Sequence, residues 1–192
     1  IAVRASITGH LVFTSLHANS AIGTVIRLVN MGLERHVVSY ALIGTLAQRL
    51  VRRICESCRV PHKIDASALK NLCDNCGIDA SLFMEPKKAS REGGLHYLSD
   101  EEKIADSFTF YKSNGCPQCN GTGYKGRIGI FEVLTINEAL REAIINKASV
   151  QDIEKIAMME GFQPMAIDAI SKAKDGLVTI DDIYPILLEK SS

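Results

Sequence analysis

Six cysteines are the residues whose type and spacing point most directly to chemistry. They form three Cys-x-x-Cys pairs, Cys55/Cys58, Cys73/Cys76 and Cys116/Cys119. Two intervening residues in every pair is the spacing of a metal knuckle, and cytosolic thiols stay reduced, so zinc is favoured over a disulfide framework. A closed tetrahedral zinc site uses four thiolates, which leaves one pair over. The spacing alone leaves the choice of pairs open.

Two histidines flank a short apolar run. His10 precedes and His17 follows the strand-like segment 11–16, and Asn19 and Ser20 come next. Taken alone, a histidine is more often a satisfied structural residue than a catalyst. Open α/β sheets, however, bind ligands at the edge where a strand ends and a helix begins. The polar cluster after residue 16 is therefore a candidate ligand site.

The elements that would position these residues alternate between helix and strand. Apolar periodicity predicts a helix end over residues 1–7, a strand over 11–16 and a helix over 21–31 that is closed by Gly32. A further helix is predicted over 35–44 and a strand over 45–54. Strand followed by helix is typical of an α/β fold with parallel strands. Because the first helix has no cap residue ahead of Ile1, we expect further chain upstream.

Residues 55–126 contain all the cysteines and most of the breakers. This texture predicts a metal-centred insert rather than a second large core, with Lys87-Lys88 and Gly93-Gly94 in an exposed loop. The glycines that follow the last cysteine pair allow backbone amides to turn towards the sulfurs of a metal site. They are Gly121, Gly123 and Gly126.

From Arg127 the pattern changes to a short strand over 128–134 and then to helices. Three positions place a hydroxyl three residues before a carboxylate, which approximates a capping box and predicts three helix starts. These pairs are Thr135/Glu138, Ser149/Asp152 and Thr179/Asp182. We assign a packing role to three methionines of this region, Met158, Met159 and Met165.

Composition excludes some classes of function. The 22 basic and 22 acidic residues give a net charge of +0, there is no tryptophan, and aromatic residues make up 6%. These values argue against a nucleic-acid module, which uses basic grooves and stacking platforms. The apolar runs are short, and the start lacks the order of a signal peptide. The sequence thus indicates a soluble, cytosolic protein.

Four motifs in order give the chain a specific resemblance. Residues 8–19 read T-G-H-L-V-F-T-S-L-H-A-N and resemble the His box T-G-H-L-V-x-S-T-L-H-T-N of type II secretion and type IV pilus assembly ATPases, with Thr14-Ser15 and Ala18 as departures. R-L-V-N-M-G at 27–32, L-A-Q-R-L-V-R at 46–52 and G-Y-K-G-R-I-G-I-F-E at 123–132 are similar to further motifs of that family.

The resemblance implies an α/β fold: the C-terminal part of a RecA-like P-loop ATPase domain over residues 1–54, a tetracysteine zinc-binding subdomain over 55–126 and a helical subdomain over 127–192. It also implies a homo-hexamer at the cytoplasmic face of the inner membrane. There the full-length protein would use ATP and magnesium to drive pilin or pseudopilin assembly. Its partners would be the inner-membrane platform protein and the cytoplasmic membrane-anchoring subunits.

Residue roles follow from the same resemblance. His10 and His17 would be catalytic, with His17 near the γ-phosphate, and Arg127 would lie at a subunit interface. Nucleotide binding or sensing would involve Thr8, Gly9, Gln48 and Arg49. The structural zinc would be held by Cys55, Cys58, Cys116 and Cys119. Cys55/Cys58 with Cys73/Cys76 remains an alternative, because their separation is also a normal zinc-ribbon gap.

The sequence contains no G-x-x-x-x-G-K-[ST] phosphate loop and no acidic magnesium-binding strand. We therefore expect the chain alone not to hydrolyse ATP, these parts being supplied upstream of Ile1 in the parent protein. The alternative function is a zinc-ribbon adaptor that binds a protein partner and has no ATPase activity.

Overall fold

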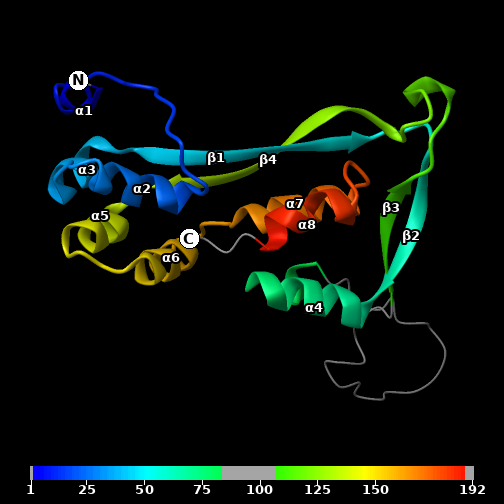
Figure 1. The fold of residues 1–192 in the computed structure, drawn as a ribbon. Coiled ribbons are helices and arrows are strands. Elements are labelled where there is room, and N and C mark those ends of the chain that lie inside the picture. Colours follow the sequence, from blue (N-terminus) through cyan, green and yellow to red (C-terminus); the bar gives the residue numbers. More distant parts are fainter. Residues whose placement is uncertain (1, 84–106, 189–192) are drawn as a thin grey trace, which may run out of the picture. The chain divides into compact units, whose positions relative to one another are not determined.

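The computed structural model describes residues 2–83 and 107–188, which divide into two units (Figure 1). The first unit comprises residues 2–49 and 129–168, and the second comprises 50–83, 107–128 and 169–188. The segment expected to form an exposed loop around Lys87-Lys88 and Gly93-Gly94 lies outside the described residues.

The first unit is mainly helical. Its helices are α1 (Ala2–Ile7), α2 (Ala21–Asn30), α3 (Arg35–Ala41), α5 (Glu138–Ile145) and α6 (Val150–Met159). Helix α3 packs on α5, α5 on α6, α6 on α2 and α2 on α3, so the four helices share one core. The fully buried side chains of that core include Val25, Val38, Leu140, Ile144 and Ile153.

A long two-stranded sheet is formed by β1 (Gly44–Ile54) and β4 (Tyr124–Thr135). The Ile136 amide donates to the Ile43 carbonyl at one end, and the Cys55 amide donates to the Gly123 carbonyl at the other. The strands are therefore antiparallel. Burial alternates with the period of two that a strand imposes. The buried positions that alternate are Thr45, Ala47 and Val51 on β1, and Ile130, Glu132 and Leu134 on β4; Ile54, the last residue of β1, is buried as well.

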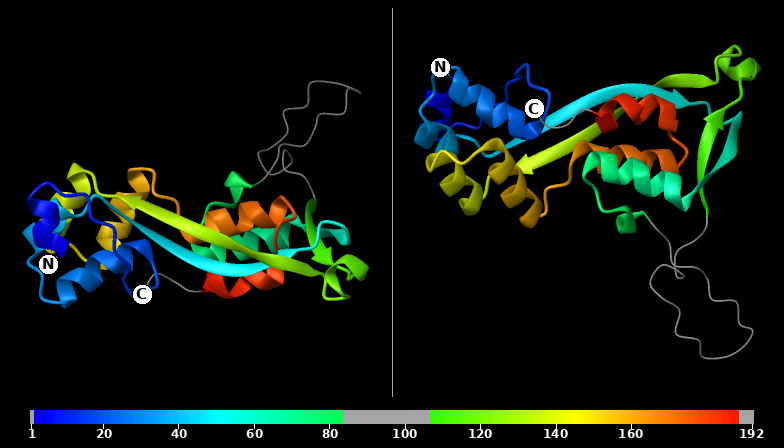
Figure 2. Two further views of the ribbon diagram at one scale, coloured as in Figure 1. Left: turned by 90° about the horizontal axis from the view of Figure 1, so that it is seen from above. Right: turned by 60° about the horizontal axis from the view of Figure 1, so that its bottom comes forward.

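The second unit holds a further antiparallel pair, β2 (Arg59–Asp65) with β3 (Ser107–Ser113). Helix α4 (Ala66–Cys76) contacts both strands and also α8 (Ile180–Leu188), as Figure 2 lets the reader follow. The polar texture of the insert did not indicate this core. Its buried side chains include Leu69, Phe108, Phe110, Ile183 and Leu187.

Two arginines, Arg52 and Arg59, join segments of the second unit through side-chain hydrogen bonds and an ion pair. Arg59 donates to the carbonyl of Gly176, which follows α7 (Met165–Lys174), at 3.1 Å and stacks over Tyr111. Arg52 lies 2.7 Å from the nearly buried carboxylate of Asp182. That ion pair raises the pKa of Arg52, mainly through the side-chain hydrogen bond to Asp182. A charge-assisted hydrogen bond of this kind is stronger than a neutral one.

Two of the three predicted helix starts are confirmed. Ser149 accepts the Asp152 amide at 3.1 Å and begins α6, and Thr179 accepts the Asp182 amide at 3.1 Å before α8. The third was wrong, because Thr135 is still the last residue of β4. Helix α5 is capped two residues later by Asn137, whose side chain accepts the Leu140 amide at 3.0 Å. Asparagine is one of the best N-cap residues.

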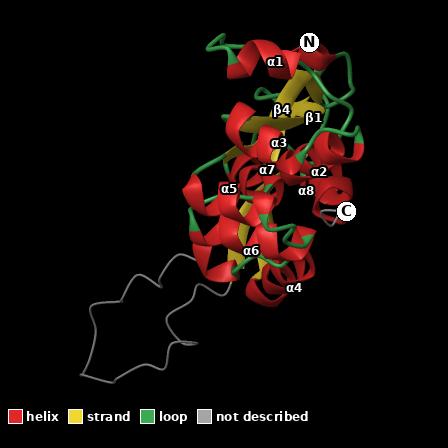
Figure 3. Cartoon of the chain, turned by 90° about the vertical axis from the view of Figure 1, so that its left-hand side faces the viewer, coloured by secondary structure: helices red, strands yellow, loops and turns green. Residues whose placement is uncertain are grey.

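The predicted strand over residues 11–16 was wrong. The connection from α1 to α2 is a loop (Figure 3), with the side chains of Leu11 and Phe13 exposed at 70% and 89%. A strand needs a neighbour to satisfy its backbone groups, and no described residue pairs with this segment. The expected parallel sheet is likewise absent from the described residues, where both strand pairs are antiparallel.

The packing role assigned to the methionines holds for one of them. Met165 is buried, whereas Met158 and Met159 are exposed at 41% and 84%. Helix α6 turns its other face to the core through Ile153 and Ala157.

Within the described part of the chain, no helix combines the length and the apolar character needed to cross a bilayer.

Candidate metal centre and nucleotide-site segments

The side chains of Cys55, Cys58, Cys116 and Cys119 converge on one point of the second unit. Their sulfurs all lie within 4.8 Å of one another, and no other group of metal-ligating side chains of this kind occurs among the described residues. The distances between sulfurs include 3.9 Å between Cys55 and Cys116, 3.9 Å between Cys58 and Cys119, and 3.8 Å between Cys116 and Cys119.

These distances fit a tetrahedral zinc ion. A zinc–sulfur bond of about 2.3 Å implies an edge of about 3.8 Å between sulfurs at the corners of a tetrahedron. A disulfide would instead need about 2.05 Å between sulfurs, and all six cysteines are free. Four thiolates would fill the coordination sphere, so such an ion would have no open position for water and would be structural.

The second knuckle, around Cys116 and Cys119, turns its backbone towards a sulfur. Cys55 follows the last residue of β1, and Cys116 to Cys119 form a turn, η3 (Pro117–Cys119), that closes before β4. The amides of Cys116 and Gly123 donate to the Cys119 sulfur at 3.2 and 3.1 Å. Gly123 achieves this with φ of +77°, which confirms the expectation that glycine would turn an amide towards a sulfur here.

The environment separates the pKa values of the clustered thiols. Burial opposes ionisation of Cys119, but the amides of Cys116 and Gly123 and the neighbouring thiols outweigh it and lower its pKa to about 6. Burial is the main cause that raises the pKa of Cys58 to about 11. A metal ion binds thiolates, so its binding would release protons from this cluster.

The third pair lies apart from this cluster. Cys73 and Cys76 are on the last turns of α4, with Cys73 fully buried and the Cys76 thiol directed at the carbonyls of Leu72 and Leu187. Burial raises the pKa of Cys73 to about 11, which disfavours the thiolate that a metal needs. The pair therefore serves as packing between α4 and α8.

Replacing Gly123 by alanine is expected to weaken metal binding by about tenfold to a hundredfold, the range seen when groups that orient metal ligands are lost. A Cβ atom at Gly123 would lie 2.5 Å from Cβ of Ser113, so the backbone that donates to Cys119 must shift. Competition with a chromophoric zinc chelator measures the affinity.

Gly126→Ala is the matched control, because Gly126 has nearly the same φ, +78°, yet nothing lies within 4 Å of its added Cβ. Its affinity for zinc is expected to stay near that of the unaltered chain. Equal losses in the two variants would show that backbone strain, and not the amide at Gly123, controls binding.

The histidine segment is held mainly at its start. The Thr8 hydroxyl donates to the Ala5 carbonyl at 2.9 Å and lies 3.3 Å from Nδ1 of His10, while Gly9 adopts a φ of +92°. His10 is exposed, and so is His17, which lies three residues before Ser20, the N-cap of α2. Both imidazoles are thus accessible to a ligand in the described structure.

The remaining candidate residues lie on the two long strands. Gln48 is exposed on β1, Arg49 beside it is half-buried, and Arg127 is exposed on β4. The structure therefore brings the four cysteines together in one cluster and, separately, places Thr8 beside His10. The other candidates lie on β1, on β4 and in the loop before α2.

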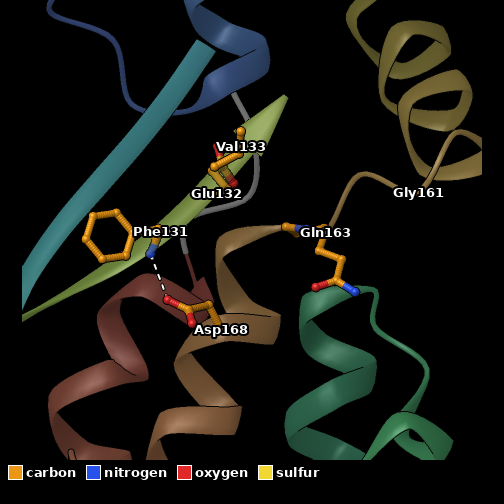
Figure 4. A pocket seen from close by; sticks show the side chains of 7 residues that line it. Phe131, Glu132, Val133, Gly161, Gln163 and Asp168 are labelled. Atoms are coloured by element: carbon orange, nitrogen blue, oxygen red, sulfur yellow. Dashed lines mark hydrogen bonds between the residues drawn. The ribbon is translucent and has the colours of Figure 1, made fainter. Parts of the chain in front are cut away.

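Sequence reasoning assigned no role to Glu132, although the structure gives it an unusual environment. This buried carboxylate accepts the Ala21 amide at 2.5 Å and the Met165 amide at 3.0 Å. It also lines a pocket of the first unit, where the neighbouring Phe131 amide donates to Asp168 (Figure 4). The alternation with Ile130 and Leu134 was the available signal that Glu132 points inward.

Comparison with known proteins gives consistent matches over nearly the whole chain. Residues 1–185 match the family described as "Type II/IV secretion system protein". The type IV pilus assembly ATPase PilB of Thermus thermophilus is 36% identical over 98% of this chain and 18% of its own length. The type II secretion system ATPase E of Vibrio cholerae is 35% identical over 98% of this chain and 32% of its own length.

A solved structure is similar in fold. The pilus retraction motor PilT with bound ADP matches 94% of this chain and 33% of its own with a TM-score of 0.51 at 22% sequence identity. Together with the mixture of helices and strands, this likeness indicates an α/β, ATPase-like fold. The chain spans between about a fifth and a third of the length of these relatives, and it belongs to the type II/IV secretion system protein family.

Proposed function

We propose that this chain is the C-terminal portion of a motor ATPase that powers pilin or pseudopilin assembly. The observation that carries the proposal is the match, from end to end, to pilus assembly and secretion ATPases. The pilus and secretion relatives match at nearly the same identity, 36% and 35%, so the proposal covers both kinds of machine.

In this proposal the parent protein is a hexamer that works with ATP and magnesium at the cytoplasmic face of the inner membrane. It acts on a platform protein and is anchored by cytoplasmic subunits of the same machine. The four clustered sulfurs hold one zinc ion, whose chemistry is structural: it ties the turn after β1 to the turn before β4. The distances of 3.8 and 3.9 Å between sulfurs support zinc in this position.

The exposed histidine before α2 is the proposed link to the nucleotide. The His17 imidazole carries an N–H that can donate to the oxygens of a transferring γ-phosphate or orient the attacking water. Arg127, exposed on β4, is available for a contact with a neighbouring subunit.

His17→Ala in the full-length protein is expected to lower ATP turnover by about a hundredfold, the size of effect seen when one positioned donor is lost. The measurement is phosphate release at saturating ATP. His36→Ala is the matched control, because His36 is exposed on α3 and pairs with the exposed Glu34 at 3.4 Å. Its turnover is expected to equal that of the unaltered protein. Unchanged turnover in His17→Ala would contradict the role proposed for His17, whereas no ATP turnover in the unaltered full-length protein would contradict the motor proposal and favour an adaptor role.

A further inference from the structure

The backbone of Ala21 is fixed on both sides by buried side chains. Ala21 is the first residue of α2 and lies four residues after His17. Its amide donates to Oε1 of Glu132 on β4, and its carbonyl accepts the hydroxyl of Thr45 on β1 at 2.9 Å. Glu132 and Thr45 are exposed at only 7% and 8%. Side chains of both β1 and β4 therefore bind the backbone of Ala21, the residue at which α2 begins.

Glu132 also reaches a second helix start. Its other oxygen, Oε2, accepts the amide of Met165, the first residue of α7, at 3.0 Å. One buried carboxylate therefore serves the N-termini of both α2 and α7, where amides without partners and the helix dipoles favour a negative charge. A second bond reinforces the contact with α7, because the Phe131 amide donates to Asp168 in its first turn at 2.9 Å (Figure 4).

The rest of the α2 N-terminus is anchored locally. Ser20 accepts the Gly23 amide at 3.0 Å, so the cap and Glu132 together satisfy two of the amides that helix formation leaves open. The segment from His17 to Ser20 ends at this anchored point. A shift of Ala21 would carry that segment with it, and a displacement of about 1 Å at a reacting group can cost about a hundredfold in rate.

We infer that Glu132 and Thr45 are positioning residues that set the place of His17 and tie it to the start of α7. The inference rests on the proposed function, in which His17 meets the γ-phosphate. Neither residue touches the nucleotide in this account. Both act through the backbone of Ala21, so they govern the rate of turnover more than the binding of ATP.

Thr45 offers the sharper test, because Thr45→Val keeps the shape of the side chain and removes the hydroxyl, whereas Thr45→Ser keeps the hydroxyl. In the full-length protein, Thr45→Val is expected to lower kcat about tenfold with KM for ATP changed less than about twofold, the split of a group that acts in the transition state. Thr45→Ser is expected to retain most of kcat.

A control separates positioning from a general loss of stability. Asn137→Ala removes the cap of α5, a helix of the same unit, and is expected to lower the melting temperature to a similar degree with unchanged kcat. A kcat for Thr45→Val no lower than that of Asn137→Ala would overturn the inference while leaving His17 in its role. If His17→Ala itself leaves turnover unchanged, the role proposed for His17 fails and the positioning role fails with it, whereas the motor proposal fails only if the full-length protein does not hydrolyse ATP.

Discussion

Removal of the metal is expected to unfold both knuckles and to give the largest loss of stability of any change considered. Structural zinc contributes roughly 10 kcal/mol in small zinc modules. Here the four sulfurs lie 3.8 to 4.8 Å apart with no covalent bond between them. Without a cation nothing would join the four sulfurs, and the two turns would keep only a few backbone hydrogen bonds.

Amide hydrogen exchange with and without a strong zinc chelator measures this effect. Amides of residues 55–59 and 115–123 are expected to lose protection by orders of magnitude. Residues 139–158 of the first unit provide the internal reference, because their buried side chains pack within that unit. Equal protection of the knuckles with and without chelator would show that the turns hold themselves together and that the cysteines have another use.

Glu132→Gln is expected to destabilise the first unit by about 3 kcal/mol. The carboxylate accepts two buried amides, those of Ala21 and Met165, whereas a glutamine offers one oxygen and turns an NH₂ group towards the other amide. An unsatisfied buried donor costs about 1–3 kcal/mol, and loss of the charge weakens the remaining bond as well. Urea unfolding followed by circular dichroism measures the change in free energy.

Glu142→Gln supplies the comparison, since it makes the same chemical change at an exposed position of α5. Surface substitutions of this kind usually stay within about 0.5 kcal/mol. If both variants unfolded at the same urea concentration, the carboxylate at Glu132 would not support the two helix starts.

Cysteine spacing could predict the knuckles but not the choice between pairs. Cys73/Cys76 has the same two-residue spacing as the other pairs, yet it lies on α4. The helical pattern of Leu69, Cys73 and Cys76, at intervals of four and three, was the sequence signal for a buried helical face. The family resemblance favoured Cys55/Cys58 together with Cys116/Cys119. Only the fold shows that the sulfurs of these two pairs converge.

Alternation along β4 could predict that Glu132 points inward, but its partners could not be read from local spacing. Ala21 lies 111 residues away in sequence and Met165 lies 33 away. The predicted strand over 11–16 failed for a related reason. An apolar run becomes a strand only beside another strand, and periodicity within the run carries no information about that neighbour.

The deciding measurement for the tetrathiolate centre is the metal stoichiometry of the purified chain, compared among the unaltered chain, Cys116→Ser and Cys73→Ser. We expect one zinc per chain in the unaltered protein and in Cys73→Ser, but no tightly bound zinc in Cys116→Ser, because Cys116 is one of the four converging cysteines and Cys73 is not. Zinc retained without Cys116, or lost without Cys73, would contradict the tetrathiolate centre formed by Cys55, Cys58, Cys116 and Cys119.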